Sequence, residues 1–71
     1  MTTQVFKVAG MTCGHCVASV TEEITAIDGV GEVRIELVPG EVSDVTVDSV
    51  SPLDVELVRA AVDEAGYDLV V

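Results

Sequence analysis

The segment EVRIELVPGEVSDVTVD, residues 32–48, alternates apolar and polar residues on both sides of a Pro-Gly pair. Before that pair, three apolar residues share one parity: Val33, Ile35 and Leu37. This is the pattern of a strand with one buried and one solvated face. Pro39-Gly40 supplies turn chemistry, so the chain is expected to fold back into a second strand that contains Val45 and Val47. The segment therefore predicts an antiparallel hairpin.

A helix is predicted on each side of this hairpin. From about residue 14 to 27, apolar residues recur at helical spacing, at Val17, Val20, Ile24 and Ile27. After the hairpin, Ser51 is the expected N-cap and Pro52 the first helical residue of a helix that runs to about Ala65. Its predicted apolar face consists of Leu57, Val58, Ala61, Val62 and Ala65. Gly66 stands where a left-handed residue commonly ends a helix.

Short strands are predicted at both ends of the chain, over residues 4–9 and 67–71. The order is then β-α-β-β-α-β. Right-handed crossovers place both helices on one face of a four-stranded antiparallel sheet, which is the α+β ferredoxin-like sandwich. In that fold the loop after the first strand and the loop before the last strand lie at the same end. Residues 1–71 are expected to form a single domain.

Composition narrows the classes of partner. Thirteen acidic residues stand against three basic ones, and the resulting net charge of −10 repels nucleic acid and anionic lipid alike. The N-terminus has no basic region followed by an apolar run, and no stretch approaches the ~20 apolar residues that span a bilayer. A cytoplasmic protein without membrane insertion is the expectation.

The segment MTCGHC, residues 11–16, contains both cysteines and the one histidine of the chain. Cys13 falls in the loop after the first strand, and Cys16 falls in the first turn of the following helix. The unpaired N–H groups and the dipole at a helix N-terminus stabilise negative charge, thiolates included. A disulfide between cysteines three positions apart closes a very short loop and stabilises a fold little. In a reducing compartment this pair is therefore expected to be reactive or metal-binding.

Among metals, two thiolates suit a soft monovalent ion that tolerates low coordination, such as Cu(I). Structural zinc requires four protein ligands and an iron–sulfur cluster about four cysteines, which one copy of this chain does not supply. Dithiol oxidoreductases use a similar C-x-x-C, but the chain is too short for a thioredoxin core. A c-type haem would need histidine at the position of Val17. Metal binding is the favoured interpretation.

Residues 10–16, GMTCGHC, resemble the signature of the heavy-metal-associated domain family, and the predicted element order matches the fold of that family over the whole chain. The resemblance implies that Cys13 and Cys16 bind Cu(I) and that Met11 packs into the core below the loop. Gly66-Tyr67 is similar to the corresponding loop of the family's bacterial copper chaperones. The resemblance further implies a copper-transporting P-type ATPase as acceptor, and dimers that form through a shared metal ion.

Three further residues near the motif each have two interpretations. His15 is expected to point into solvent and tune affinity or dimer contacts, with direct ligation as the alternative. Tyr67 either fills one end of the core or shields a copper–thiolate centre from water. Met11 is expected to be a core residue rather than a ligand, although its thioether is soft enough for Cu(I).

The sequence thus predicts a cytoplasmic Cu(I) metallochaperone without catalytic activity, which passes its metal on by thiolate exchange. The alternatives are a metal-binding domain of a larger P-type ATPase or mercuric reductase, a carrier of zinc or another heavy metal, and a dithiol oxidoreductase. The Met1 start and the end of the chain just after the last strand favour a free-standing protein. Because the chain is acidic, its partner is expected to be basic, or to make mainly apolar contacts around the metal loop.

Overall fold

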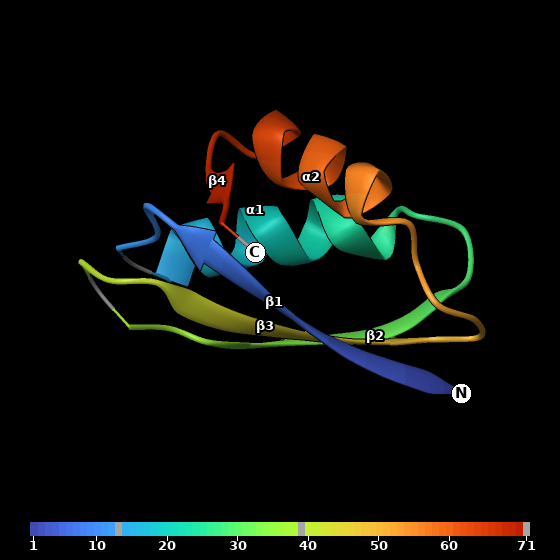
Figure 1. The fold of residues 1–71 in the computed structure, drawn as a ribbon. Helices are drawn as coiled ribbons and strands as arrows, with labels where there is room; N and C mark the ends of the chain where they lie inside the picture. Colours follow the sequence, from blue (N-terminus) through green and yellow to red (C-terminus); the bar gives the residue numbers. More distant parts are fainter. Residues whose placement is uncertain (13, 39, 71) are drawn as a thin grey trace.

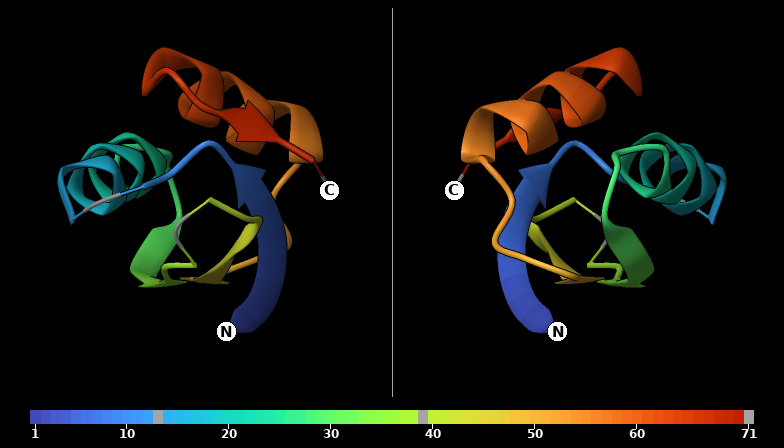
Figure 2. Two further views of the ribbon diagram at one scale, coloured as in Figure 1. Left: turned by 90° about the vertical axis from the view of Figure 1, so that its left-hand side faces the viewer. Right: turned by 90° about the vertical axis from the view of Figure 1, so that its right-hand side faces the viewer.

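The computed structural model describes residues 1–12, 14–38 and 40–70, which form four strands and two helices (Figure 1). In chain order these are β1 (Thr2–Ala9), α1 (Gly14–Thr25), β2 (Val30–Glu36), β3 (Ser43–Ser49), α2 (Val55–Glu64) and β4 (Asp68–Leu69). The sheet order is β2-β3-β1-β4, and each described neighbouring pair is antiparallel. Both helices cover the same face of the sheet (Figure 2). The predicted ferredoxin-like sandwich is confirmed.

The predicted hairpin forms between β2 and β3. Pairing is regular from Glu32 opposite Asp48 to Glu36 opposite Asp44, with a register shift between Val30 and Glu32. Along β3 the residues alternate between buried and half-buried, as expected for a strand at the centre of the sheet with one face on the core. Gly40 lies in the turn; Pro39 lies outside the described residues.

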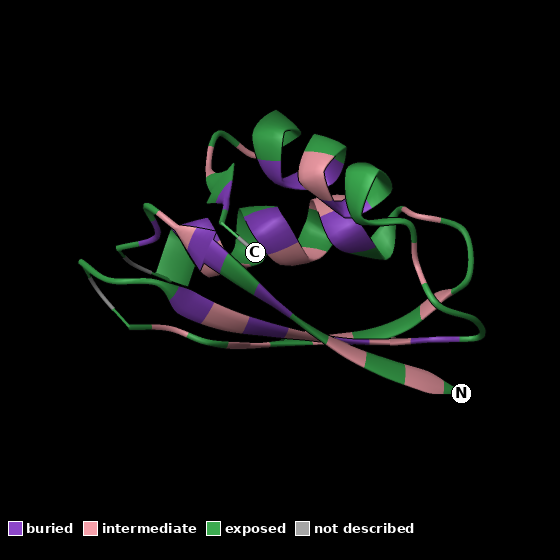
Figure 3. Cartoon of the chain, in the orientation of Figure 1, coloured by how far each residue is buried: buried purple, intermediate pink, exposed green. Residues whose placement is uncertain are grey.

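The core lies between the sheet and the two helices (Figure 3). Its buried apolar residues come from nearly every element: Phe6, Val8, Met11, Cys16, Val20, Ile24, Val45, Val47, Val58, Ala61, Val62 and Leu69. Aliphatic side chains dominate, as the composition predicts. The predicted stripe is buried at Val20 and Ile24 of α1 and half-buried at Val17. Ile27, also half-buried, lies two residues beyond the end of this helix, which was expected to include it. No helix among the described residues is long and apolar enough to cross a membrane.

The start of α2 differs from the prediction. Its N-cap is Asp54, whose carboxylate accepts a hydrogen bond from the Glu56 N–H at 2.9 Å, whereas Ser51 was expected to cap it. The reason is tertiary: the Leu53 N–H donates to Gln4 Oε1 at 2.8 Å, and the Ser51 carbonyl accepts from the Ser49 hydroxyl at 2.7 Å. Residues 51–53 are thus held against β1 and β3, and the helix begins after them.

The apolar face of α2 is also narrower than predicted. Val58, Ala61 and Val62 are buried, but Leu57 is 53% exposed because it stands at the margin of that face. At the other end the prediction is confirmed, since Gly66 has a φ of +91° and its N–H donates to the Asp63 carbonyl at 2.9 Å. The last strand is shorter than expected, with Asp68 and Leu69 alone; Val71 lies outside the described residues.

Candidate metal centre

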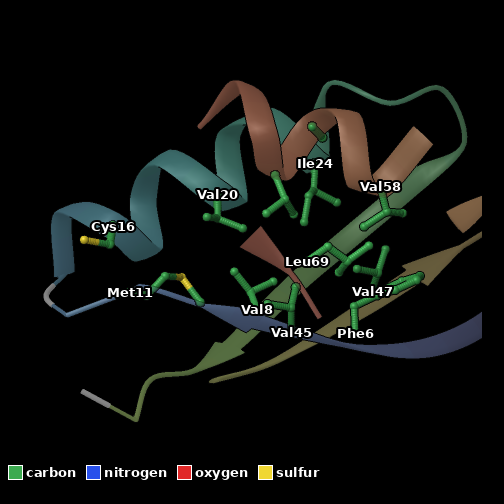
Figure 4. Packing of buried hydrophobic residues seen from close by; sticks show 12 residues of the cluster. Phe6, Val8, Met11, Cys16, Val20, Ile24, Val45, Val47, Val58 and Leu69 are labelled. Atoms are coloured by element: carbon green, nitrogen blue, oxygen red, sulfur yellow. The ribbon is translucent and has the colours of Figure 1, made fainter. Parts of the chain in front are cut away.

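The candidate site lies where β1 leaves the sheet and α1 begins. Cys16 occupies the first turn of α1 and is 8% exposed, with its side chain at one end of the core (Figure 4). Cys13 lies outside the described residues. The first turn of a helix presents unpaired N–H groups, and α1 carries no acidic residue there to compete for them. The helix terminus at Cys16 therefore stabilises a thiolate better than a mid-helix position would.

Met11 anchors the start of this loop. Its side chain is fully buried, at the same end of the core as Cys16 (Figure 4). The expectation that Met11 packs into the core is confirmed. Because a buried methionine contacts many neighbours, it holds the chain to the core immediately before the loop.

The threonine of the motif approaches the cysteine that the structure describes. Thr12 Oγ1 lies 4.0 Å from Cys16 Sγ, a contact in which either atom can donate. The predicted apolar stripe of the first helix did not include Cys16, and no contact between Thr12 and Cys16 was predicted. Both features have a signal in the sequence, because Thr12, Cys16, Val20 and Ile24 follow one another at intervals of four, the spacing that brings residues onto one side of a helix.

His15 points the other way. It is exposed, next to the buried Cys16, as expected for a residue on the outer side of the first turn. Its predicted exposure is confirmed, and ligation of a metal by His15 stays a prediction. Among the residues that the structure describes, no three His, Cys, Asp or Glu side chains gather closely enough to hold a metal ion.

Tyr67 comes to this site from the other end of the chain. Antiparallel pairing sets Ala9 opposite Asp68, so the loop after β1 and the turn before β4 meet, as the fold prediction required. A Cβ built on Gly10 would lie 3.5 Å from Tyr67 Cδ1, so the ring rests against the backbone at Gly10. Tyr67 is half-buried and also packs on the core. Its predicted packing at one end of the core is confirmed, and its role in shielding a copper–thiolate centre stays a prediction.

Comparison with known proteins gives the family. The model of the heavy-metal-associated domain matches residues 5–68, and the chain belongs to this family. The copper chaperone CopZ of Staphylococcus aureus is 37% identical over 70 residues, which are 99% of this chain and all of that protein.

Two solved structures extend the likeness. A CopZ metallochaperone superposes with a TM-score of 0.83 at 33% identity, over 97% of this chain and 100% of its own. A putative copper-ion-binding protein from Bacillus anthracis superposes with a TM-score of 0.73 at 29% identity, over 96% and 93% of the two chains.

Proposed function

We propose that the chain is a cytoplasmic chaperone for Cu(I), which Cys13 and Cys16 bind as a pair of thiolates. The observation that carries the proposal is the position of Cys16: buried in the first turn of α1, at the end of the core that Met11 closes. The copper chaperones that the chain resembles over nearly its full length support the choice of metal.

The chemistry of the site favours a soft ion. The dipole of α1 stabilises a thiolate by about 0.3–1 kcal/mol, which is less than the ~1.36 kcal/mol that shifts a pKa by one unit. The helix therefore does not ionise the thiols unaided, and the bound metal must supply most of the driving force for their deprotonation. Two thiolates satisfy Cu(I), which tolerates low coordination, whereas structural zinc requires two further ligands.

Release follows from the same chemistry. A cysteine thiolate of the acceptor adds to Cu(I), a three-coordinate intermediate forms, and one thiolate of the chaperone leaves with a proton. We propose a copper-transporting P-type ATPase as the acceptor, through a domain of similar fold. Residues 1–71 act as one domain that carries metal without catalysing a reaction, and two copies can share one metal ion as a bridged homodimer.

Two neighbouring side chains are assigned supporting roles. The ring of Tyr67, which rests against Gly10, shields the metal loop from water. His15 is exposed and tunes affinity or the contact between two copies. A His15→Ala variant titrated with Cu(I) separates tuning from ligation, because loss of a ligand lowers affinity far more than loss of a neighbour.

The choice of metal is tested by anaerobic titration of the reduced chain with Cu(I) and with Zn(II), each against a calibrated chelator. The proposal expects Cu(I) to be held against a strong chelator and Zn(II) to be surrendered to a weaker one. Retention of Zn(II) with loss of Cu(I) would make the chain a zinc carrier. Rapid reduction of insulin by the metal-free chain would instead indicate a dithiol oxidoreductase.

The bridged homodimer is tested by sedimentation of the chain with no metal and with half an equivalent of Cu(I). Metal-dependent dimers are expected. A dimer of equal strength in both samples would place the contact elsewhere on the surface.

A further inference from the structure

All three basic side chains of the protein are engaged by carboxylates. The pairs are Lys7 with Asp44, Arg34 with Glu32 at 3.4 Å and Asp48 at 3.3 Å, and Arg59 with Glu56 at 3.5 Å. Arg59 also donates to the Leu69 carbonyl at 3.4 Å, so its guanidinium has two acceptors. Lys7, Arg34 and Arg59 thus each have a carboxylate partner within the molecule, in a chain whose net charge is −10.

Three segments lie at the end of the molecule that carries the metal loop. Pairing of Val8 with Ser43 brings the hairpin turn to this end, and pairing of Ala9 with Asp68 brings the turn after α2 (Figure 1). None of the segments 10–16, 36–42 and 63–68 contains lysine or arginine. Segments 36–42 and 63–68 together contain five carboxylates: Glu36, Glu41, Asp63, Glu64 and Asp68.

Charge matters in thiolate exchange because the entering group must reach the copper as an anion. The copper stays Cu(I) throughout. One Cu–S bond forms to the entering thiolate and one Cu–S bond to the protein breaks, while the entering thiol gives up a proton and the leaving protein thiolate takes one up. A molecule of net charge −10 repels any entering thiol that bears additional negative charge.

We propose that the field of the chain makes its dithiol site selective for the charge of the exchanging thiol. Anionic small thiols are repelled from the site, whereas uncharged and cationic thiols enter it. Bound Cu(I) is therefore protected from removal by anionic cellular thiols and can be removed by uncharged or cationic ones. The inference rests on the proposed Cu(I) function, but the same field acts on the metal-free dithiol, which allows the two to be tested separately.

The expected size follows from Coulomb's law with Debye screening. The radius of gyration is 10.7 Å and the net charge is −10. For this charge acting at roughly 15 Å in water, raising the ionic strength from about 0.02 M to about 0.5 M changes an approach rate by about five-fold per unit of probe charge. Relative to a neutral probe, the change has opposite signs for cations and anions. The neutral probe supplies the baseline, because the reacting thiolate itself carries one negative charge.

The metal-independent test uses three disulfides that oxidise the reduced chain and are themselves reduced to two small thiols. They are cystamine, which is doubly cationic; bis(2-hydroxyethyl) disulfide, which is neutral; and 3,3′-dithiodipropionate, which is doubly anionic. Comparing low with high salt for each reagent cancels its intrinsic reactivity. As salt is raised, the cystamine rate is expected to fall by more than five-fold relative to the rate of the neutral disulfide, and the dithiodipropionate rate is expected to rise by more than five-fold relative to it. Equal salt responses for the three reagents would overturn the inference.

The metal-dependent test follows Cu(I) removal by the matching thiols: cysteamine, 2-mercaptoethanol and 3-mercaptopropionate. The same order is expected, and the same salt responses when each is taken relative to that of 2-mercaptoethanol. If the chain binds no Cu(I), the proposed function fails, but the disulfide experiment still tests whether the dithiol site is selective for the charge of the reagent. If it binds Cu(I) and releases it without regard to the charge of the thiol, the inference alone fails.

Two variants of equal net charge locate the effect. Glu64→Gln with Asp68→Asn removes two carboxylates at the metal end, and Glu22→Gln with Asp28→Asn removes two from late in α1 and just beyond it. The first pair is expected to narrow the low-salt ratio of cystamine to dithiodipropionate rates by about ten-fold, and the second pair by a smaller factor. Equal narrowing by the two pairs would contradict a field concentrated at the metal end.

Discussion

Gly10 and Gly14, the two glycines of the segment 10–16, should respond oppositely to alanine. Gly10 has a φ of +96°, which costs an L-residue roughly 1–2 kcal/mol, and a Cβ there would stand 3.5 Å from Tyr67, an ordinary contact. Against this, alanine lowers the entropy of the unfolded chain, which contributes roughly 0.4–1 kcal/mol of stability. Gly10→Ala should therefore destabilise the fold by about 1 kcal/mol, through its backbone rather than through a clash.

Gly14→Ala is the matched control. Gly14 is the first residue of α1 and its φ is not positive. Among the described residues, no atom lies within 4 Å of an added Cβ, apart from those of its chain neighbours and the backbone of its own helix. The entropy gain is then not offset, and the variant should be more stable than the parent by about 0.5 kcal/mol. The two variants should differ by about 1.5 kcal/mol in the free energy of unfolding, measured by urea titration of the reduced, metal-free chain with a common m-value. A neutral or stabilising Gly10→Ala would refute the reasoning, as would a loss of stability in Gly14→Ala.

Three further predictions concern the helix cap, the core and the partner. Asp54→Ala removes the N-cap of α2 and should lower the free energy of unfolding by about 1 kcal/mol, with a loss of helical circular dichroism. The control Asp63→Ala, at an exposed residue, should change the free energy of unfolding little. Equal losses of stability in the two variants would argue against Asp54 as the cap. Met11→Ala empties a fully buried position and should lower the free energy of unfolding by roughly 2–4 kcal/mol, measured by thermal or urea unfolding. The control Leu57→Ala, at a residue 53% exposed, should lower it by less than about 1 kcal/mol. A loss below about 1 kcal/mol in Met11→Ala would mean that Met11 does not anchor the start of the loop. Copper transfer to an acceptor domain with a basic surface should slow as salt is raised, and a rate that does not depend on salt would argue for a mainly apolar contact.

The sheet and its pairing could be predicted from the sequence because the alternation of apolar and polar residues in the hairpin fixes its register. Val45 and Val47 alternate with Thr46 and Asp48, and a slip by one residue would bury the polar set. The structure buries both valines fully, opposite Ile35 and Val33 of β2. Local pattern and global fold agree here, so the pattern sufficed.

The start of α2 could not be predicted in the same way. Ser51-Pro52 is a good local signal for a helix start, and Asp54 is another one three residues later. The choice between them is made by Gln4, 49 residues away from Leu53, whose side-chain oxygen accepts the Leu53 N–H. A contact of that separation leaves no trace in the local pattern.

At the candidate site, too, one feature could be predicted from the sequence and another could not. That Tyr67 meets the metal loop follows from strand order alone, because β1 and β4 must be neighbours in this fold. The burial of Cys16 required a choice of helical face, and the apolar stripe was placed on Val17 when Cys16, Val20 and Ile24 in fact form it. Cysteine is easily passed over in such patterns, although its thiol buries as readily as an aliphatic side chain.

The measurement that bears most directly on the central claim is a Cu(I) titration of the reduced chain against a calibrated chelator, run beside the variant Cys13→Ser with Cys16→Ser. Far-ultraviolet circular dichroism establishes that both proteins are folded. We expect the parent to bind one Cu(I) per chain, and we expect the chelator to take all the copper from the variant. A folded variant that holds Cu(I) as tightly as the parent would contradict it, since the metal would then be bound by other side chains.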